Sequence, residues 1–454
     1  MSMQAEKSAT NFKKEFDQTF RSLKHRNFRI YFLGQLVSLS GTWMQGVALS
    51  WLVYRMTHSP VALAQVESAN LLPMLVFGLL GGSLADKWDR KKMLLCTQSL
   101  AMLQAVVLAY LTLTNQLQIW QAICLAAWVG TCSAFEVPSR QALLVDLVDR
   151  ENLVNAISLN SSLFQGARTI GPAVGGMLVA AAGEGICFVI NAISFLAAII
   201  AIALLKVEKR EKVSHAESQH VSEALKFVWR EASVRRVLLL AVVLSLFGLQ
   251  FTVLLPVFAH EILGGDVKTL GALRAVAGVG AFFAALNLAN RGSGEFLKYA
   301  VGFASVAFSC ALIAFCFSRN IWISLMLASV IGLSMTTQMS GGHSLLQLAV
   351  SDRLRGRVMS IYMMVLLGMA PFGSYIVGLC ANRWGAPLTV AVCGFVCLCS
   401  GVVYLLSVRT AKIAVAKQIL AGEQADSAGG KEVDKDGQMP DQSVQLGAET
   451  PTRE

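Results

Sequence analysis

Charged residues are scarce in this chain, and their scarcity limits what it can be. Only 15% of its 454 residues are Asp, Glu, Lys or Arg, while 55% are hydrophobic and the mean hydropathy is +0.58. Soluble domains carry about a quarter charged residues. The apolar residues also form runs of twenty or more, which is the length that one helical membrane crossing requires. A soluble enzyme, a secreted disulfide scaffold and a disordered protein are therefore excluded as classes.

The motifs of common catalytic and cofactor sites are also missing. The sequence contains no GxxxxGK[ST] nucleotide loop, no HExxH zinc motif and no GxSxG nucleophile motif. The ten cysteines lie in apolar stretches, and the cluster of Cys393, Cys397 and Cys399 lacks a CxxC pair. We interpret the cysteines as reduced packing residues. We expect neither an enzyme nor a cofactor or metal site.

Twelve apolar segments qualify as transmembrane helices, so we predict an all-α membrane protein. The basic stretch before the first segment has no small-residue cleavage site, which argues against a removable signal peptide. The expected spans are approximately 28–53, 60–84, 92–113, 118–138, 160–182, 185–206, 237–259, 268–290, 297–318, 320–344, 357–381 and 386–408.

The distribution of Lys and Arg sets the orientation. Between the spans, one side holds nearly all basic residues, and the other holds only Arg55, Lys268, Arg319 and Arg383. By the positive-inside rule both termini are cytoplasmic. The net charge of +10 then reflects topology and attraction to anionic lipid, so no nucleic-acid partner is expected.

The longest break between spans divides the chain into two halves. We expect a cytoplasmic N-terminal segment (1–27), a six-helix bundle (28–206), a linker (207–236), a second six-helix bundle (237–408) and a disordered cytoplasmic tail (409–454). Within the linker, Leu225, Val228 and Trp229 are spaced as one apolar face of a short helix on the membrane surface. Two pseudo-symmetric bundles with a central loop are typical of transporters.

Two short loops carry ordered charges after a span. Charged pairs at helix ends are a usual element of gates, so we assign a gating role to both loops. We expect Gly82 to let its helix end pack tightly. The candidate residues are Gly82, Asp86, Arg90 and Lys91 in the first loop, and Asp352, Arg353 and Arg357 in the second.

The fifth span contains a run of small residues around a proline. Small residues allow close helix approach, and a proline kinks a span. This helix-packing motif consists of Gly166, Gly171, Pro172, Gly175 and Gly176.

These loops and this motif resemble the signatures of the major facilitator superfamily. The resemblance covers residues 20–408 and extends to the branch that contains the enterobactin exporter and multidrug efflux proteins. It implies a monomeric exporter driven by a proton gradient, without a cofactor. Asp89 stands where the family usually has glycine, and residues 118–134 lack the arginine that proton-coupled members often have there.

Ionisable residues inside spans are costly and are functional candidates. For proton coupling we select Glu67, Glu136 and Arg168. A desolvated Glu67 can exchange protons, or it can simply bond to a neighbouring helix. We expect Glu136 to pair with Arg140 or Arg168, and Arg168 otherwise to attract an anionic substrate. Arg274 and His343 are expected to have structural positions, Arg274 by reaching toward the outer surface.

Uncharged polar residues in the spans are candidates for the wall of a substrate cavity. Trp43, Phe247 and Met363 would add apolar contacts that suit a bulky amphipathic molecule. The polar candidates are Gln35, Gln45, Asn70, Asn191, Gln250, Thr336, Gln338 and Tyr362.

The sequence therefore favours a secondary transporter of the bacterial inner membrane that exports siderophore-like or drug-like molecules by alternating access, in exchange for protons. Two alternatives remain open. One is a transporter of lysophospholipids or other lipids on the same fold. The other is a receptor that transports nothing and binds a partner through its acidic tail.

Overall fold

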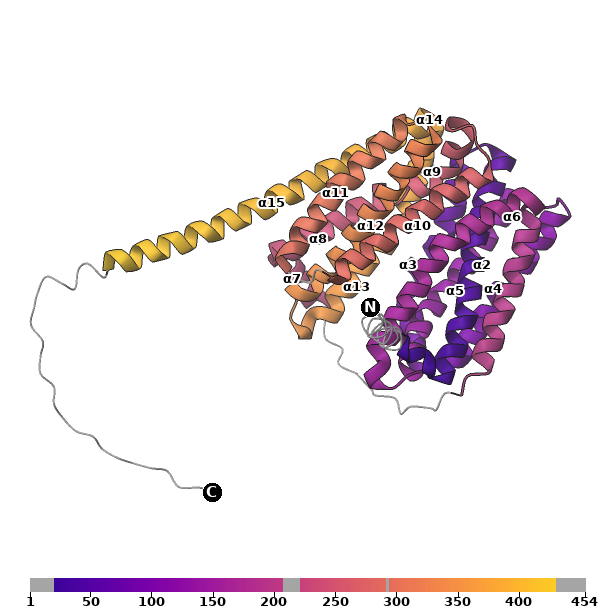
Figure 1. Cartoon of the computed structure of the whole chain (residues 1–454), viewed down its shortest axis with the longest axis horizontal. Helices are drawn as coiled ribbons and strands as arrows, with labels where there is room; N and C mark the ends of the chain where they lie inside the picture. The colour runs from indigo at the N-terminus through magenta and orange to yellow at the C-terminus, as the bar shows by residue number, and fades with distance from the viewer. Residues whose placement is uncertain (1–19, 207–220, 291–293, 430–454) are drawn as a thin grey trace, which may run out of the picture. The chain divides into compact units, whose positions relative to one another are not determined.

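The computed structural model describes residues 20–206, 221–290 and 294–429, and every regular element in these ranges is helical (Figure 1). Eleven helical segments there are long and apolar enough to cross a membrane. They form the two six-helix bundles that the sequence predicts.

The first half contains five long helices. The helix α2 packs against α6, α3 packs against α5, and α4 packs against both α5 and α6. The elements of this half are η1 (Arg21–Lys24), α2 (Arg26–Thr57), α3 (Pro60–Lys87), α4 (Arg90–Leu113), α5 (Ile119–Asp146), η2 (Arg150–Asn152) and α6 (Leu153–Ala203).

Helix α6 supplies two crossings rather than one. Its 51 residues would extend about 77 Å as one straight helix, which is more than twice the hydrocarbon thickness of about 30 Å. Gly183 breaks it with φ 83° and ψ 169°, a conformation open to glycine because it has no Cβ. The eleven segments therefore make twelve crossings, as expected from the sequence.

The second half is more interrupted. One crossing combines α8, η3, α9 and η4, in which η3 and η4 are π-helical turns, and another combines α13 with α14. The elements are α7 (Val221–Arg230), α8 (Ala232–Val243), η3 (Leu244–Gly248), α9 (Phe251–Val257), η4 (Phe258–Ile262), α10 (Val267–Asn290), α11 (Gly294–Phe317), α12 (Ile321–Ala349), α13 (Asp352–Gly368), α14 (Ala370–Trp384) and α15 (Ala386–Gly429).

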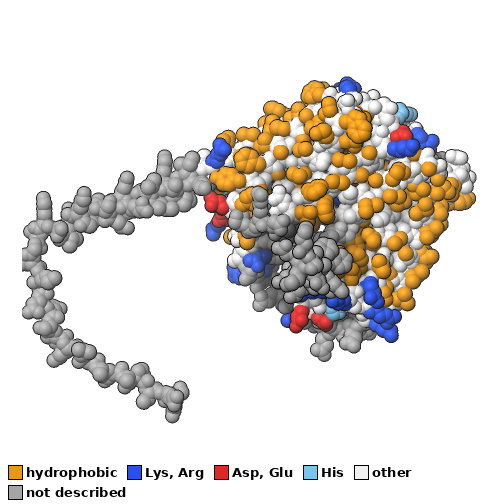
Figure 2. Space-filling model, viewed as in Figure 1, with side chains coloured by type: hydrophobic (Ala, Val, Ile, Leu, Met, Phe, Trp, Pro, Cys, Tyr) orange, Lys and Arg blue, Asp and Glu red, His pale blue; other side chains and the backbone are white. Residues whose placement is uncertain are grey.

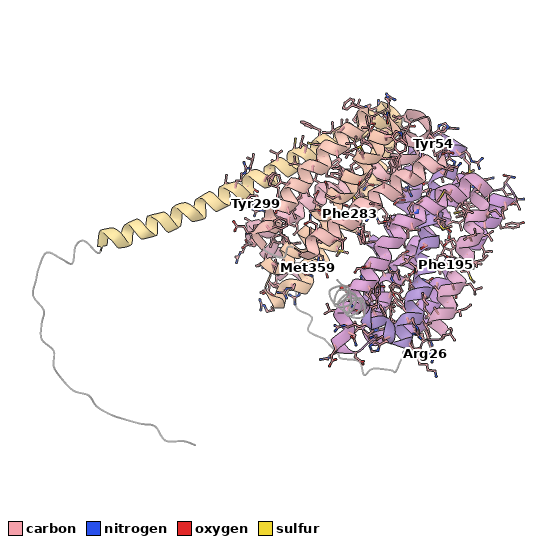
Figure 3. All side chains as sticks on the ribbon, in the orientation of Figure 1. Arg26, Tyr54, Phe195, Phe283, Tyr299 and Met359 are labelled. Atoms are coloured by element: carbon pink, nitrogen blue, oxygen red, sulfur yellow. The ribbon has the colours of Figure 1, made fainter. Side chains whose placement is uncertain are left out.

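Each crossing connects the same two ends of the helix bundles. We call one the His58 end, after the turn between α2 and α3, and the other the Trp88 end, after the turn between α3 and α4. Tyr54 and Arg26 lie at these opposite ends of α2 (Figure 3). Large apolar side chains such as Leu239, Phe303 and Phe395 are exposed on the flanks. Figure 2 shows this apolar surface, with most charged side chains near the two ends.

Two helices continue further than the sequence indicated. Helix α5 runs through Pro138 to Asp146, and α15 continues to Gly429. The expectation of disorder from residue 409 is therefore wrong for residues 409–429. The Ala, Lys, Gln and Leu residues after position 410 are strong helix formers, and a pair of glycines follows them. Residues 430–454 lie outside the described ranges.

The linker helix α7 forms, but its apolar residues do not share one environment. Ala224 and Val228 are buried, whereas Leu225 and Trp229 are exposed. Leu225, Val228 and Trp229 share one side of this helix at helical spacing, and its position on the membrane surface stays a prediction. Glu223 forms ion pairs with Arg353 and Arg357, so α7 is joined to the start of α13.

Candidate functional site

Helices α6 and α10 join the two halves through glycine contacts near the His58 end. A Cβ atom on Gly271 would lie 2.7 Å from the Pro172 carbonyl oxygen and 3.0 Å from the Gly176 Cα. A Cβ on Gly278 would lie 2.9 Å from the Thr169 Cα. Such distances leave no room for a side chain, so the two backbones are in direct contact.

A second junction between the halves lies between α3 and α14. The Ser68 and Ser374 hydroxyl oxygens are 2.6 Å apart, and Ser68 donates to the Pro371 carbonyl oxygen at 2.9 Å. A Cβ on Gly378 would lie 2.2 Å from the Ala64 Cβ. The halves are therefore closed against each other at the His58 end.

Toward the Trp88 end the same helices separate. Leu75, Gly78 and Gly82 lie on one stripe of α3. The side chain of Leu75 approaches Gly368 of α13, but no atom of the described residues lies within 4 Å of a Cβ placed on Gly78 or Gly82. On α6, Ser158 and Ser162 continue the stripe of Thr169 and are exposed. The space between the halves thus opens at the Trp88 end.

An opposite-charge pair crosses between the halves. Glu67 of α3 and Arg274 of α10 lie within electrostatic range of each other. The Arg274 guanidinium is 3.5 Å from the Thr252 carbonyl oxygen and close to the backbone of α2 at Gly46. Its Nε is buried without a hydrogen-bond partner. The expectation that Arg274 reaches toward the surface is therefore wrong: its guanidinium lies in the interior, beside the backbones of α9 and α2.

Arg168 occupies an aromatic corner of the same interior. Its guanidinium carbon lies 5.9 Å from the centre of the Trp43 ring, and Phe164 meets Trp43 edge to face at 5.8 Å. Among the described residues Arg168 has no ion-pair partner. Phe164 and Ser161, on the same stripe of α6, are exposed, so this corner faces the open space between the halves.

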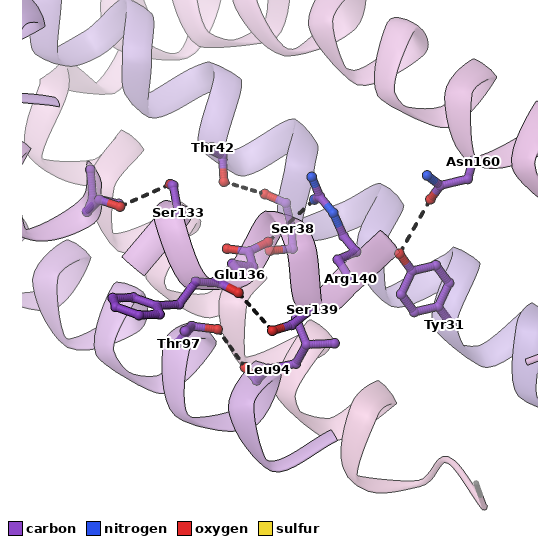
Figure 4. Close-up of polar contacts among 12 residues, drawn as sticks. Tyr31, Ser38, Thr42, Leu94, Thr97, Ser133, Glu136, Ser139, Arg140 and Asn160 are labelled. Carbon is purple, nitrogen blue, oxygen red and sulfur yellow. Dashed lines mark hydrogen bonds and ion pairs between the residues drawn. The ribbon is translucent and has the colours of Figure 1, made fainter. Parts of the chain in front are cut away.

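Glu136 is paired with Arg140 rather than with Arg168. The two lie on successive turns of α5, and Arg140 donates to the carboxylate at 3.4 Å (Figure 4). Both side chains are largely buried. Nearby, the Tyr31 hydroxyl donates to the Asn160 amide oxygen at 3.4 Å. The ion pair between Glu136 and Arg140 is one of the two partnerships that we expected for Glu136.

Two of the expected cavity residues belong to a buried polar network inside the first half. Asn191 donates to the Gln45 oxygen at 2.8 Å, Gln45 donates to Gln104 at 3.3 Å, and Ser194 donates to Asn191 at 3.0 Å. All four are buried. In this conformation Gln45 and Asn191 therefore join α2, α4 and α6 and line no open space.

The remaining cavity candidates are mostly buried as well. Gln250 donates to the Ser245 carbonyl oxygen at 2.6 Å across a π-helical turn, and Tyr362 donates to Met339 at 2.8 Å, next to His343. Gln35, Thr336 and Gln338 are buried, and Gln35 has no hydrogen-bond partner for its amide. The partly exposed candidates are Trp43, Asn70, Phe247 and Met363.

The charged side chains of the first loop bind groups at the ends of neighbouring helices. Arg90 donates to Asp146 at 2.7 Å, and Lys91 donates to the Ala203 and Leu205 carbonyl oxygens that end α6. Asp89, the departure from the family pattern, accepts from the Lys91 and Lys92 backbone amides and caps α4. The side chain of Asp86 lies outside the described part of the structure, as does that of Asp352 in the second loop.

The glycine contacts differ in part from the expected ones. Gly81, not Gly82, makes the close approach in α3, since its Cβ would lie 2.2 Å from the Ala134 carbonyl oxygen. In α6, Gly171 and Gly175 pack on α2, and Gly176 packs on α10. A Cβ on Gly166 would meet nothing within 4 Å, so this residue takes no part in the packing motif.

Sequence reasoning missed an aromatic and acidic cluster at the His58 end. The Tyr54 hydroxyl donates to Glu261, and the rings of His58 and His260 lie 6.0 Å apart. The cluster connects α2 with η4. No sequence signal indicated this cluster, because its two parts are about 200 positions apart in the chain and follow no motif.

The transmembrane secretion effector family matches residues 17–426 of this chain. The chain belongs to this family of the major facilitator superfamily. It is thus a multi-pass membrane transporter and not an enzyme.

Similar proteins include exporters of two kinds. The chain is 28% identical to the staphyloferrin A transporter of Staphylococcus aureus over 85% of this chain and 97% of that protein. It is 23% identical to the multidrug efflux pump Tap of Mycolicibacterium fortuitum over 84% and 96%. The match to an enterobactin exporter of Shigella boydii is 29% identical but covers only 35% of this chain and 38% of the other.

Solved structures share the fold. A bacterial homologue of the human lysosomal transporter Spinster, in an inward-facing and occupied conformation, superposes with a TM-score of 0.68 at 12% identity, covering 85% of this chain and 97% of that one. A nucleoside transporter gives 0.67 at 13% identity, covering 84% and 99%.

Proposed function

We propose that this protein is a monomeric proton antiporter of the bacterial inner membrane that exports small amphipathic molecules, siderophore-like or drug-like, by alternating access. Both termini lie in the cytoplasm, and the Trp88 end faces it. The basic residues gathered on that side support this orientation. The names of two relatives, a staphyloferrin transporter and a multidrug efflux pump, support the substrate range.

The observation that carries the proposal is the position of Arg274 of α10, whose guanidinium reaches the backbone of α2 in the other half and lies within electrostatic range of Glu67. Arg274 thus connects the two halves next to the junctions that close the His58 end. When Glu67 takes up a proton it loses its charge, and its attraction to Arg274 of the other half disappears. Proton binding at Glu67 thereby favours separation of the halves, and proton release favours their closure.

Transport into inside-out vesicles tests the coupling. We expect an imposed pH gradient to drive accumulation of fluorescent drugs and of a catecholate siderophore in the wild type. Glu67→Gln removes the proton site and should abolish the dependence on the gradient. Glu136→Gln is the matched control: this carboxylate is also within a span, but its partner is on the same helix, so gradient dependence should remain.

Two results would contradict the proposal. Accumulation in the wild type regardless of the gradient would exclude proton coupling and direct attention to lipid transport on the same fold. Equal loss in Glu67→Gln and Glu136→Gln would show that the effect is not specific to the carboxylate between the halves.

A further inference from the structure

The charges in the interior of the spans do not balance. Glu136 is paired with Arg140 on α5, and Glu67 lies within electrostatic range of Arg274. Arg168 has no carboxylate partner among the described residues. A guanidinium left without a counter-charge at membrane depth is costly, and contact with a Trp ring offsets only part of that cost.

The two interior arginines lie along the same side of α2. Arg168 contacts Trp43, and Arg274 approaches Gly46. These two positions are three residues apart, which corresponds to about 4.5 Å along the helix axis. The buried Nε–H of Arg274 also finds no acceptor in the described part of the chain. The region therefore presents two cations and an unused donor, with one carboxylate to balance them.

The surroundings of Arg168 are flat and apolar. Trp43 and Phe164 form an edge-to-face corner beside the guanidinium, and Phe164 is 38% exposed. A planar ring can stack in such a corner while a carboxylate on that ring accepts two hydrogen bonds from arginine. A neutral ring would gain only the stacking contact.

We infer that Arg168, Trp43 and Phe164 form a subsite for an anionic group on an aromatic substrate, with Arg168 as the residue that determines specificity for negative charge. This inference rests on the proposed export function, because it names the substrate class of the same interior. Arg274 adds positive potential, which increases when Glu67 is protonated.

Equilibrium binding to the purified full-length protein in detergent tests the subsite without any pH gradient, so the result is independent of proton coupling. The probes are two matched pairs: dansylglycine with dansylglycinamide, and 2,3-dihydroxybenzoate with 2,3-dihydroxybenzamide. In the wild type we expect each carboxylate to bind at least about tenfold more tightly than its amide, which is the size of one charge-assisted hydrogen-bond pair.

The variants separate charge recognition from folding. Arg168→Gln should reduce the preference for the carboxylate to about onefold while leaving amide affinity unchanged, and Arg168→Lys should retain most of the preference. Equal binding of acid and amide by the wild type, failure of both acids to bind, or an unchanged preference in Arg168→Gln would each overturn the inference. If the preference holds while Glu67→Gln still transports with the gradient, only the coupling proposal fails.

Discussion

At the scale of single residues, the interior of the first half depends on amide hydrogen bonds. Gln45, Gln104 and Asn191 come from three helices and are all buried. In the bilayer core no water is available to form hydrogen bonds, so a buried polar group without a protein partner is energetically costly. Each of these amides therefore fixes the rotation of its helix relative to the other two.

Removing one amide should destabilise the protein. Asn191→Ala deprives the Gln45 oxygen of its donor and the Ser194 hydroxyl of an acceptor, and an orphaned buried group costs about 1–3 kcal/mol. We expect the variant to unfold at a lower temperature in detergent. The matched control is Asn70→Ala, because the described residues provide no hydrogen-bond partner for the Asn70 side chain. Equal melting temperatures for both variants would contradict this account.

The sequence identified the ionisable residues of the interior but not their partners. Glu136 and Arg140 are four positions apart, so helical spacing alone indicated their contact. Glu67 and Arg274 belong to different halves, and no local pattern connects them. In a uniformly apolar span, the sequence also does not indicate which side of the helix faces a cavity and which side packs on other helices. For this reason we expected Gln45 and Asn191 in a cavity wall.

At the scale of elements, the junction between α6 and α10 depends on the absence of side chains. Gly271 and Gly176 bring the two backbones together, and this contact requires small residues in both helices. The sequence motif in α6 predicted close packing. It did not indicate that one side of the motif would meet α2 and the other α10.

We expect Gly271→Ala to be unfavourable although alanine is the better helix former. The added methyl group would lie 2.7 Å from a carbonyl oxygen that cannot move aside, and overpacking of this kind costs about 1–3 kcal/mol. Thermal unfolding should show a lower midpoint. Gly166→Ala is the control and should be neutral or stabilising by up to about 1 kcal/mol, because its position is open. A similar loss in both variants would count against a special role for the junction.

The span count was predictable because length and hydropathy alone set it. The residues at which the helices end were less predictable. The expected span ended near position 138, but α5 continues to Asp146, which forms an ion pair with Arg90. A contact with a distant residue stabilises the extra turns, and such contacts are invisible to a local pattern.

At the scale of the whole molecule, the two halves are joined more closely at one end than at the other. The halves touch at the His58 end and separate at the Trp88 end. The alternating access proposed above predicts that the junction between α3 and α14 opens at another stage of the transport cycle.

Locking that junction should stop transport reversibly. In Ser68→Cys/Ser374→Cys the thiols replace two hydroxyls whose oxygens are 2.6 Å apart, so mild oxidation should join the halves. We expect vesicle uptake to fall at least about tenfold after oxidation and to recover with a reducing agent. Each single-cysteine variant is a control for the ten native cysteines. Full activity of the oxidised double variant, with the cross-link shown on a gel, would exclude opening at this site.

The position of Glu67 also has a consequence for how the protein is made. Its partner Arg274 is encoded about 200 residues later, and at 5–20 residues per second the ribosome needs roughly 10–40 s to reach it. During that interval α3 is already in the bilayer with an unbalanced acid. Glu136 and Arg140 lie on the same helix, so they enter the bilayer together and the carboxylate is balanced at once. We therefore expect Glu67 to remain in its uncharged, protonated form in the nascent first half until the second half has been inserted.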